Sequence, residues 1–410
     1  MNSTYTGWLL IPTDTGVDLA PGWVRVINGI ITEVNTAGFA ERVEFGDDST
    51  LILPGLIDCH LHIPQFPVIG AGGLPLLTWL AQVVFPEEAK WADADYAEAV
   101  ADLAATRLLS VGTVAISAFA TVHAEATQRA INVMGRRGLR GFVGQSLMDR
   151  ECPPELARPA MQLLREAAKL EQCSGIYPII TPRFAISCSP ELLHGAGALA
   201  RKLGQPVQTH LAETRPELER IAELFGDEPY TAIYDRFGLL GPRSLLAHCI
   251  YLSPEEQAII NRSGSVAAHC PTANTFLQSG LMNKGAMEQA AVRLALGSDI
   301  GGGYERSMVR VARAMVETAR IVALESGDAE AVPSAAQAWR MITRGNAEAL
   351  GLADAGRIEP GVRADLVIAR PDPEAFTSPD PLGFLLHAWD DRWITATLLQ
   401  GDIAHGQIPE

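Results

Sequence analysis

Short apolar runs alternate along most of the chain with longer stretches in which apolar and polar residues follow helical spacing. Buried strands and amphipathic helices produce these two patterns. The helical stretches include 95–109, 191–203 and 307–324. The strand-like runs are 51–57, 113–119, 139–146, 176–181, 206–210, 244–248, 265–269 and 292–297. Strands that alternate with helices in this way predict an α/β fold, a TIM-like (β/α)8 barrel of parallel strands.

The two ends of the chain follow a different pattern. Residues 24–34 are typical of two strands joined by an Asn-Gly dipeptide, a strong signal for a tight hairpin. Near the other end, 364–368 and 394–399 are again strand-like. We expect two domains: a small β-sandwich made from residues 1–53 and 356–410, and the barrel made from 54–355.

The composition indicates a globular protein and restricts its partners. Hydrophobic residues make up 48% of the 410 residues, which is ample for a large core. The formal net charge of -16 disfavours binding to nucleic acid and to anionic lipid. The apolar stretches are too short to span a membrane, and the six cysteines form no C-x-x-C pair. We therefore expect a cytoplasmic protein that binds neither nucleic acid nor membrane.

Histidines gather at the predicted carboxyl ends of the strands, where active sites of such barrels are built. His60 and His62 end the first strand, and His210, His248 and His269 end the fifth, sixth and seventh. A single histidine there is ordinarily a packed core residue. Several histidines that converge on one face are instead typical of a metal cluster.

We expect one transition metal, held by His60, His62, His210 and Asp299, the last of which follows the eighth strand. His60 and His62 are two apart on an extended chain, so both side chains project to the same side. Nitrogen ligands favour zinc, with iron possible, over magnesium or calcium. No lysine lies near 181–184 at the end of strand four to bridge a second metal, which favours one zinc per chain.

Other polar and aromatic residues near these strand ends allow more than one role. Glu213 follows His210 by three residues and is close enough to move protons, although a glutamate there is ordinarily solvated. His123 begins an H-x-E sequence, but the C-x-x-C motif that accompanies it in zinc deaminases of cytidine and of nucleic-acid bases is absent, so a packing role is favoured. For His269 we favour a pocket wall or a structural hydrogen bond. Trp79 is about equally suited to a pocket wall and to a core or lid aromatic.

Several of these motifs resemble the amidohydrolase superfamily, in particular its one-metal aminohydrolase branch. The resemblance rests on residues 53–62, the spacing from His210 to Glu213, His248, and Gly297-Ser298-Asp299. Further elements resemble members that act on guanine, namely Pro64-Gln65, Phe85-Pro86-Glu87, 180–185 and 270–274. The resemblance spans about residues 51–370.

The resemblance implies hydrolytic deamination of a purine by a homodimer. A metal-activated hydroxide would add to C2 of guanine, and collapse of the adduct would release ammonia and leave xanthine. Glu213 would pass a proton to the neighbouring ring nitrogen, His248 would hold the hydroxide, and Asp299 would accept its proton.

Three residues would recognise the ring in this scheme. Gln65 and Arg183 would contact the ring edge and its carbonyl, with Phe184 packed beside them. Because Arg183 is a fixed donor, we expect an amine that faces it to leave the cation unpaired, which would disfavour 2,6-diaminopurine. The alternatives are deamination of another flat aminated ring (a pterin, triazine or oxidised purine) and, more remotely, a non-catalytic scaffold that binds ligands.

Overall fold

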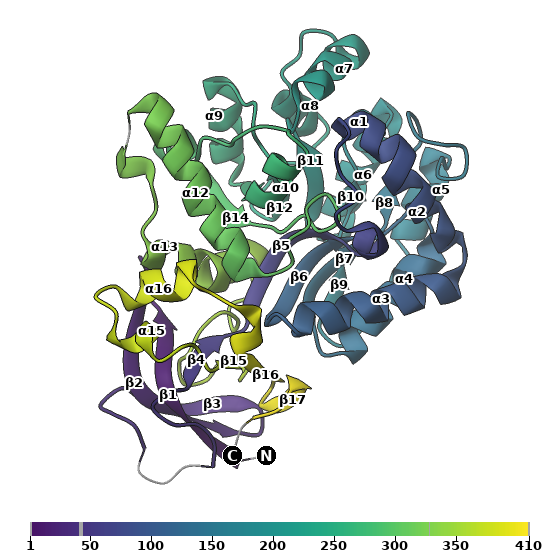
Figure 1. The fold of residues 1–410 in the computed structure, drawn as a ribbon. Helices are drawn as coiled ribbons and strands as arrows, with labels where there is room; N and C mark the ends of the chain where they lie inside the picture. Colours follow the sequence, from purple (N-terminus) through teal and green to yellow (C-terminus); the bar gives the residue numbers. More distant parts are fainter. Residues whose placement is uncertain (1, 41–43, 328, 409–410) are drawn as a thin grey trace.

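The computed structural model describes residues 2–40, 44–327 and 329–408. Its central part is built from parallel strands with helices packed around them (Figure 1). One four-stranded parallel sheet contains β5 (Leu56–His62), β6 (Thr113–Phe119), β7 (Arg140–Gly144) and β9 (Ile176–Pro178). A second contains β11 (Val207–Leu211), β12 (Ser244–His248), β13 (Val266–His269) and β14 (Arg293–Leu296). The short strands β8 (Ser146–Leu147) and β10 (Thr181–Pro182) pair with each other between the two sheets. The α/β class predicted from the sequence is confirmed.

Backbone hydrogen bonds join the two parallel sheets on both sides. At one seam the backbone nitrogen of Gln208 donates to the oxygen of Ile180 at 3.0 Å. At the other seam the nitrogen of Asp299 donates to the oxygen of His60 at 2.8 Å, and that of His62 to Ile300 at 2.9 Å. The second seam brings the segment after β14 beside the end of β5, so residues 239 positions apart meet.

The helices mostly follow strands, as the alternating pattern predicts. They are α1 (Leu76–Trp79), α2 (Phe85–Ala89), α3 (Ala94–Leu109), α4 (Ala124–Arg136), α5 (Ala160–Ala167), α6 (Pro190–Leu203), α7 (Arg215–Phe225), α8 (Tyr230–Arg236), α9 (Pro254–Ser263), α10 (Pro271–Phe276), α11 (Lys284–Gln289), α12 (Met308–Ser326), α13 (Ala335–Arg340), α14 (Asn346–Leu350), α15 (Glu374–Thr377) and α16 (Pro381–His387). Among the described helices, none is long and apolar enough to cross a bilayer.

Strands from the two ends of the chain share one seven-stranded sheet, which lies below the parallel strands in Figure 1. Its order is β17 (Asp402–Gly406), β16 (Ile394–Leu399), β15 (Leu366–Ala369), β4 (Leu51–Pro54), β1 (Asn2–Pro12), β2 (Val17–Ile27) and β3 (Ile30–Asn35). The predicted hairpin between β2 and β3 turns at Asn28 and Gly29, whose φ angles are 51° and 79°. These strands form a single hydrogen-bonded sheet, whereas the predicted β-sandwich would have two. The predicted domain boundaries stay a prediction.

The first predicted strand, 51–57, is divided in the structure. Residues up to Pro54 belong to β4 in the seven-stranded sheet, whereas β5 begins at Leu56 in the parallel sheet. Gly55 marks the transition, because a Cβ there would lie 2.3 Å from a methyl carbon of Val114. The apolar run is continuous in sequence because both strands are fully buried, so hydrophobic pattern alone does not separate them.

Candidate active site

Three imidazoles and one carboxylate converge where β5, β11 and β14 end. The Nε2 atoms of His60 and His62 each lie 3.2 Å from Oδ1 of Asp299. The Nε2 atoms of His62 and His210 are 3.1 Å apart. Ligand atoms at the corners of a tetrahedral zinc site are separated by roughly 3.3 Å, given bonds of about 2.0–2.1 Å. These three distances among the four predicted ligands are close to the spacing that such a site requires.

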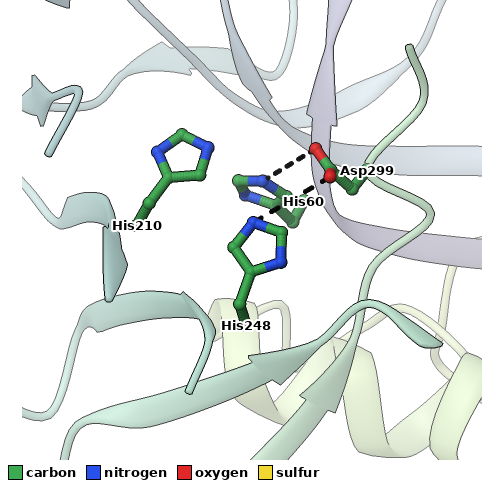
Figure 2. A group of neighbouring side chains, drawn as sticks. All are labelled: His60, His210, His248 and Asp299. Atoms are coloured by element: carbon green, nitrogen blue, oxygen red, sulfur yellow. Dashed lines mark ion pairs between the residues drawn. The ribbon is translucent and has the colours of Figure 1, made fainter. Parts of the chain in front are cut away.

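His248 stands at the edge of this cluster. Figure 2 draws it with His60, His210 and Asp299, and one ligand atom from each of these four residues lies within 4.8 Å of the others. The Nε2 atom of His248 is 3.9 Å from Oδ2 of Asp299 and 3.5 Å from Oε2 of Glu213. His62 makes shorter contacts to the cluster than His248 does, so His62 fits a ligand position better and His248 faces both carboxylates.

Burial sets the protonation of these groups. It lowers the pKa of His62 to about 3, and lowers the pKa values of His60 and His210 as well. The pKa of Asp299 is well below its ordinary value because donors from His60 and His62 outweigh its burial. Near pH 7 the site therefore presents neutral imidazoles and an ionised carboxylate, the forms that bind a metal ion.

Two features of the chain allow Asp299 to reach this position. Asp58, fully buried in β5, accepts hydrogen bonds from the backbone nitrogen and the hydroxyl of Ser298 at 3.0 and 2.5 Å. After Asp299 the backbone turns back on itself, and a Cβ on Gly302 would lie 2.6 Å from Oδ2 of Asp299. Gly301 has a φ of 66° and leaves no room for a Cβ beside Gln65. The two glycines thus permit the backbone to pack closely against Asp299 and Gln65.

Glu213 is buried against His248, contrary to the solvated position that is ordinary for a glutamate after a strand. Its Oε1 accepts a hydrogen bond of 2.7 Å from the hydroxyl of Ser279. Burial raises the pKa of Glu213, and His248 opposes that shift. Burial by itself would lower the pKa of His248, but Glu213 and Asp299 raise it above its ordinary value. Nδ1 of His248 lies 2.8 Å from Oδ1 of Asn274, an amide oxygen that can only accept, so Nδ1 donates.

The same cavity contains the residues that were predicted to recognise a substrate. Its walls include His62, Gln65, Leu76, Trp79, Leu80, Arg183, Phe184, His210, Glu213, His248, Leu277, Asp299 and Gly302. The indole nitrogen of Trp79 donates to the backbone oxygen of Ala71 at 2.5 Å, and its ring is buried. Trp79 therefore lines the pocket, which was one of the two positions expected for it.

Arg183 already has a partner in the fold, so an amine that faced it would not by itself leave the cation unpaired, as the sequence argument assumed. Its Nη1 donates to both oxygens of Glu88 at 2.8 Å, and both side chains are almost fully buried. The guanidinium also lies 5.5 Å from the ring centre of Phe85. Sequence reasoning missed Glu88 because a glutamate in a short helix carries no signal of burial. Ser279 and Asn274 were missed as supporting residues because nothing in the local sequence marks a serine or an asparagine as buried.

The other two histidines considered from the sequence, His123 and His269, have different surroundings. The ring of His123 is half-buried, and its Nδ1 lies 3.0 Å from the hydroxyl of Thr121, in keeping with a packing role. His269 is 2% exposed, and neither of its ring nitrogens has a hydrogen-bond partner among the described residues. Burial, reinforced by Lys284, lowers the pKa of His269 to about 3. A structural hydrogen bond for His269 is therefore not formed within the described part of the chain.

The parallel α/β fold and the buried histidine–aspartate cluster define the class of metal-dependent hydrolases. The family model of the amidohydrolase family matches residues 51–404, and the chain belongs to that family.

Relatives and solved structures extend the comparison. A guanine deaminase from Dictyostelium discoideum is 37% identical over 64% of this chain, and the match spans 60% of that relative's length. The crystal structure of a guanine deaminase from C. acetobutylicum, which has guanine bound in its active site, is 30% identical. It superposes with a TM-score of 0.91 over 98% of this chain and 100% of its own. An adenosine deaminase from Xanthomonas campestris with bound zinc is 26% identical, with a TM-score of 0.86 over 98% and 92% of the two chains.

Proposed function

We propose that this protein hydrolyses guanine to xanthine and ammonia. The observation that carries the proposal is one buried cavity that unites the histidine–aspartate cluster, Glu213, and the polar pair Gln65 and Arg183. Its similarity to guanine deaminases, one of them solved with guanine bound, supports the choice of substrate.

The metal that we propose is one zinc ion per chain, with iron as the alternative. The ligand set would be His60, His62, His210 and Asp299, supported by their 3.1–3.2 Å spacing and by neutral imidazoles near pH 7. His210 is prepared for this role, because its Nδ1 lies 2.6 Å from the backbone oxygen of Arg183 and must donate to it. Its Nε2 therefore carries the lone pair. When bound, zinc lowers the pKa of water and so supplies the nucleophile at neutral pH.

We assign proton transfer to Glu213. Its burial raises its pKa, which suits a group that takes a proton from water and gives it to the ring nitrogen beside C2. The Nε2 atom of His248 lies 3.5 Å from Oε2 of Glu213, and His248 would help to orient the attacking water. Asp299 would accept the second proton of the water and pass it to the amine at C2, which then leaves as ammonia.

Gln65, Arg183, Phe184 and Trp79 are the proposed substrate contacts. All four side chains line the cavity and are at most 5% exposed. A planar ring between the aromatic walls would place its polar edge against Gln65 and Arg183. Such a site accepts flat heterocycles and sorts them by the hydrogen-bonding pattern of that edge.

We also propose that the parallel strands close into a TIM-like barrel of eight βα units. Backbone hydrogen bonds at both seams between the sheets support closure. The division into a barrel at 54–355 and a smaller domain at 1–53 and 356–410, the homodimer and the cytoplasmic location stay predictions.

Ammonia release from a panel of guanine, 2,6-diaminopurine, a pterin and an aminated triazine tests the function. We expect kcat/KM for guanine to exceed that for each other compound by at least roughly 30-fold. A faster pterin or triazine would replace guanine as the substrate while the hydrolytic chemistry stands. Release from none of them would favour a binding protein.

A further inference from the structure

Glu88 joins the two polar residues of the proposed substrate edge. It lies in α2, and its side chain has no exposed surface. Oε1 of Glu88 accepts a hydrogen bond of 3.1 Å from Nε2 of Gln65, and both of its oxygens accept from Nη1 of Arg183. One carboxylate therefore holds both side chains.

The contact with Glu88 determines which end of the Gln65 amide faces the cavity. An ionised carboxylate only accepts hydrogen bonds, so the NH₂ group of Gln65 must be the end that contacts it. The Oε1 atom of Gln65 is buried without a hydrogen-bond partner among the described residues, and Gln65 lines the cavity. The amide therefore presents an acceptor to a ligand.

Arg183 presents the opposite polarity. Its Nη1 is held by Glu88, and Phe85 lies against the guanidinium, which together fix the plane of the group. A guanidinium has only donors, so any group that it offers to the cavity is an N–H. Gln65 and Arg183 together form an acceptor next to a donor.

We propose that Glu88 is a positioning residue which sets this acceptor–donor order, so that the site selects rings with an N–H next to a carbonyl. Guanine presents N1–H to an acceptor and O6 to a donor, whereas a 6-aminopurine presents the reverse pattern. The inference rests on the proposed function and adds to it the residue that imposes the substrate class. Neutralising Glu88 should free the Gln65 amide to rotate and to donate to an unprotonated ring nitrogen.

The substitution Glu88→Gln tests this directly, with kcat/KM measured for guanine and 2,6-diaminopurine. We expect the preference for guanine to shrink by about tenfold or more, mainly through a higher KM for guanine. The matched control is Glu87→Gln, at the neighbouring buried glutamate of α2, which pairs with Lys90 and Tyr96. This control should keep the wild-type preference even if its melting temperature falls.

An unchanged preference in folded Glu88→Gln would overturn the inference while leaving the function intact. Wild-type protein that releases no ammonia from guanine would instead overturn the function.

A measurement on wild-type protein covers the case in which Glu88→Gln fails to fold. Hypoxanthine and adenine both lack the amine at C2, and differ in the edge that they present. Calorimetric titration should show hypoxanthine binding at least about tenfold more tightly than adenine. Equal affinity would mean that the site has no fixed acceptor–donor order, and the proposed role of Glu88 would be wrong.

Discussion

The backbone oxygen of Arg183 lies 2.6 Å from Nδ1 of His210, at the seam where β10 and β11 meet. The carbonyl can only accept, so His210 must carry its proton on Nδ1 and direct the lone pair of Nε2 toward the cluster. The side chain of the same Arg183 lines the cavity. A single residue thus couples the orientation of a predicted metal ligand to the predicted recognition of the substrate.

The first prediction concerns metal content. Purified protein should contain one equivalent of zinc or iron per chain, and His62→Ala should lose most of it, because Nε2 of His62 is within 3.2 Å of two other predicted ligands. Elemental analysis measures both. His123→Ala is the control and should keep its metal. Two equivalents per chain in fully active protein would contradict a one-metal site.

The second prediction concerns Glu213. Glu213→Gln should keep the fold and the metal but lower kcat by roughly two to four powers of ten, since the amide cannot accept and pass on a proton. Steady-state kinetics and a metal assay test both parts. Turnover close to that of the wild type would assign the proton transfer to another group.

The third prediction concerns Ser279, whose hydroxyl holds Oε1 of Glu213. Because this hydrogen bond lowers the pKa of Glu213, Ser279→Ala should move the acidic limb of the kcat/KM profile to higher pH. We expect kcat to fall by about tenfold near neutral pH. Tyr251→Phe is the control, because its hydroxyl donates to the backbone oxygen of Ser279 and, among the described residues, makes no hydrogen bond with the Glu213 carboxylate. Identical pH profiles for wild type, Ser279→Ala and Tyr251→Phe would rule out a role for Ser279 in positioning Glu213.

The fourth prediction concerns Glu217 and stability. Burial raises the pKa of Glu217 from 4.5 to about 7, so the folded protein holds a proton that the unfolded chain has released between these values. The stability associated with this group is present below pH 4.5 and is lost as the pH rises through about 7. Glu217→Gln does not titrate, and should gain stability relative to wild type by up to about 3 kcal/mol between about pH 5 and pH 8.

Urea denaturation at about pH 5 and about pH 8 measures the difference in the free energy of unfolding between wild type and Glu217→Gln. Thr214→Ala, which removes the other half of the same capping box, is the control and should cost about 1 kcal/mol at both. A constant difference between wild type and Glu217→Gln would show that the Glu217 carboxylate ionises alike in the folded and unfolded chains.

The local pattern of apolar and polar residues determined the alternation of strands and helices, and it identified the residues that end the strands. The predicted runs 113–119 and 244–248 coincide with β6 and β12, because short apolar segments between helices leave few alternatives. The convergence of His60, His62, His210 and Asp299 was also predictable, because the carboxyl ends of neighbouring parallel strands lie at the same edge.

Only the tertiary structure decided how these residues are supported. Glu88 reaches Arg183 across 95 positions, and Ser279 reaches Glu213 across 66. Neither residue lies at a strand end, so no periodicity in the sequence marks it. A buried carboxylate and an exposed one look the same in a sequence, because the partner that compensates the charge is brought by the fold. The chemistry of the site was therefore encoded locally, whereas the orientation of its donors and acceptors depends on long-range packing.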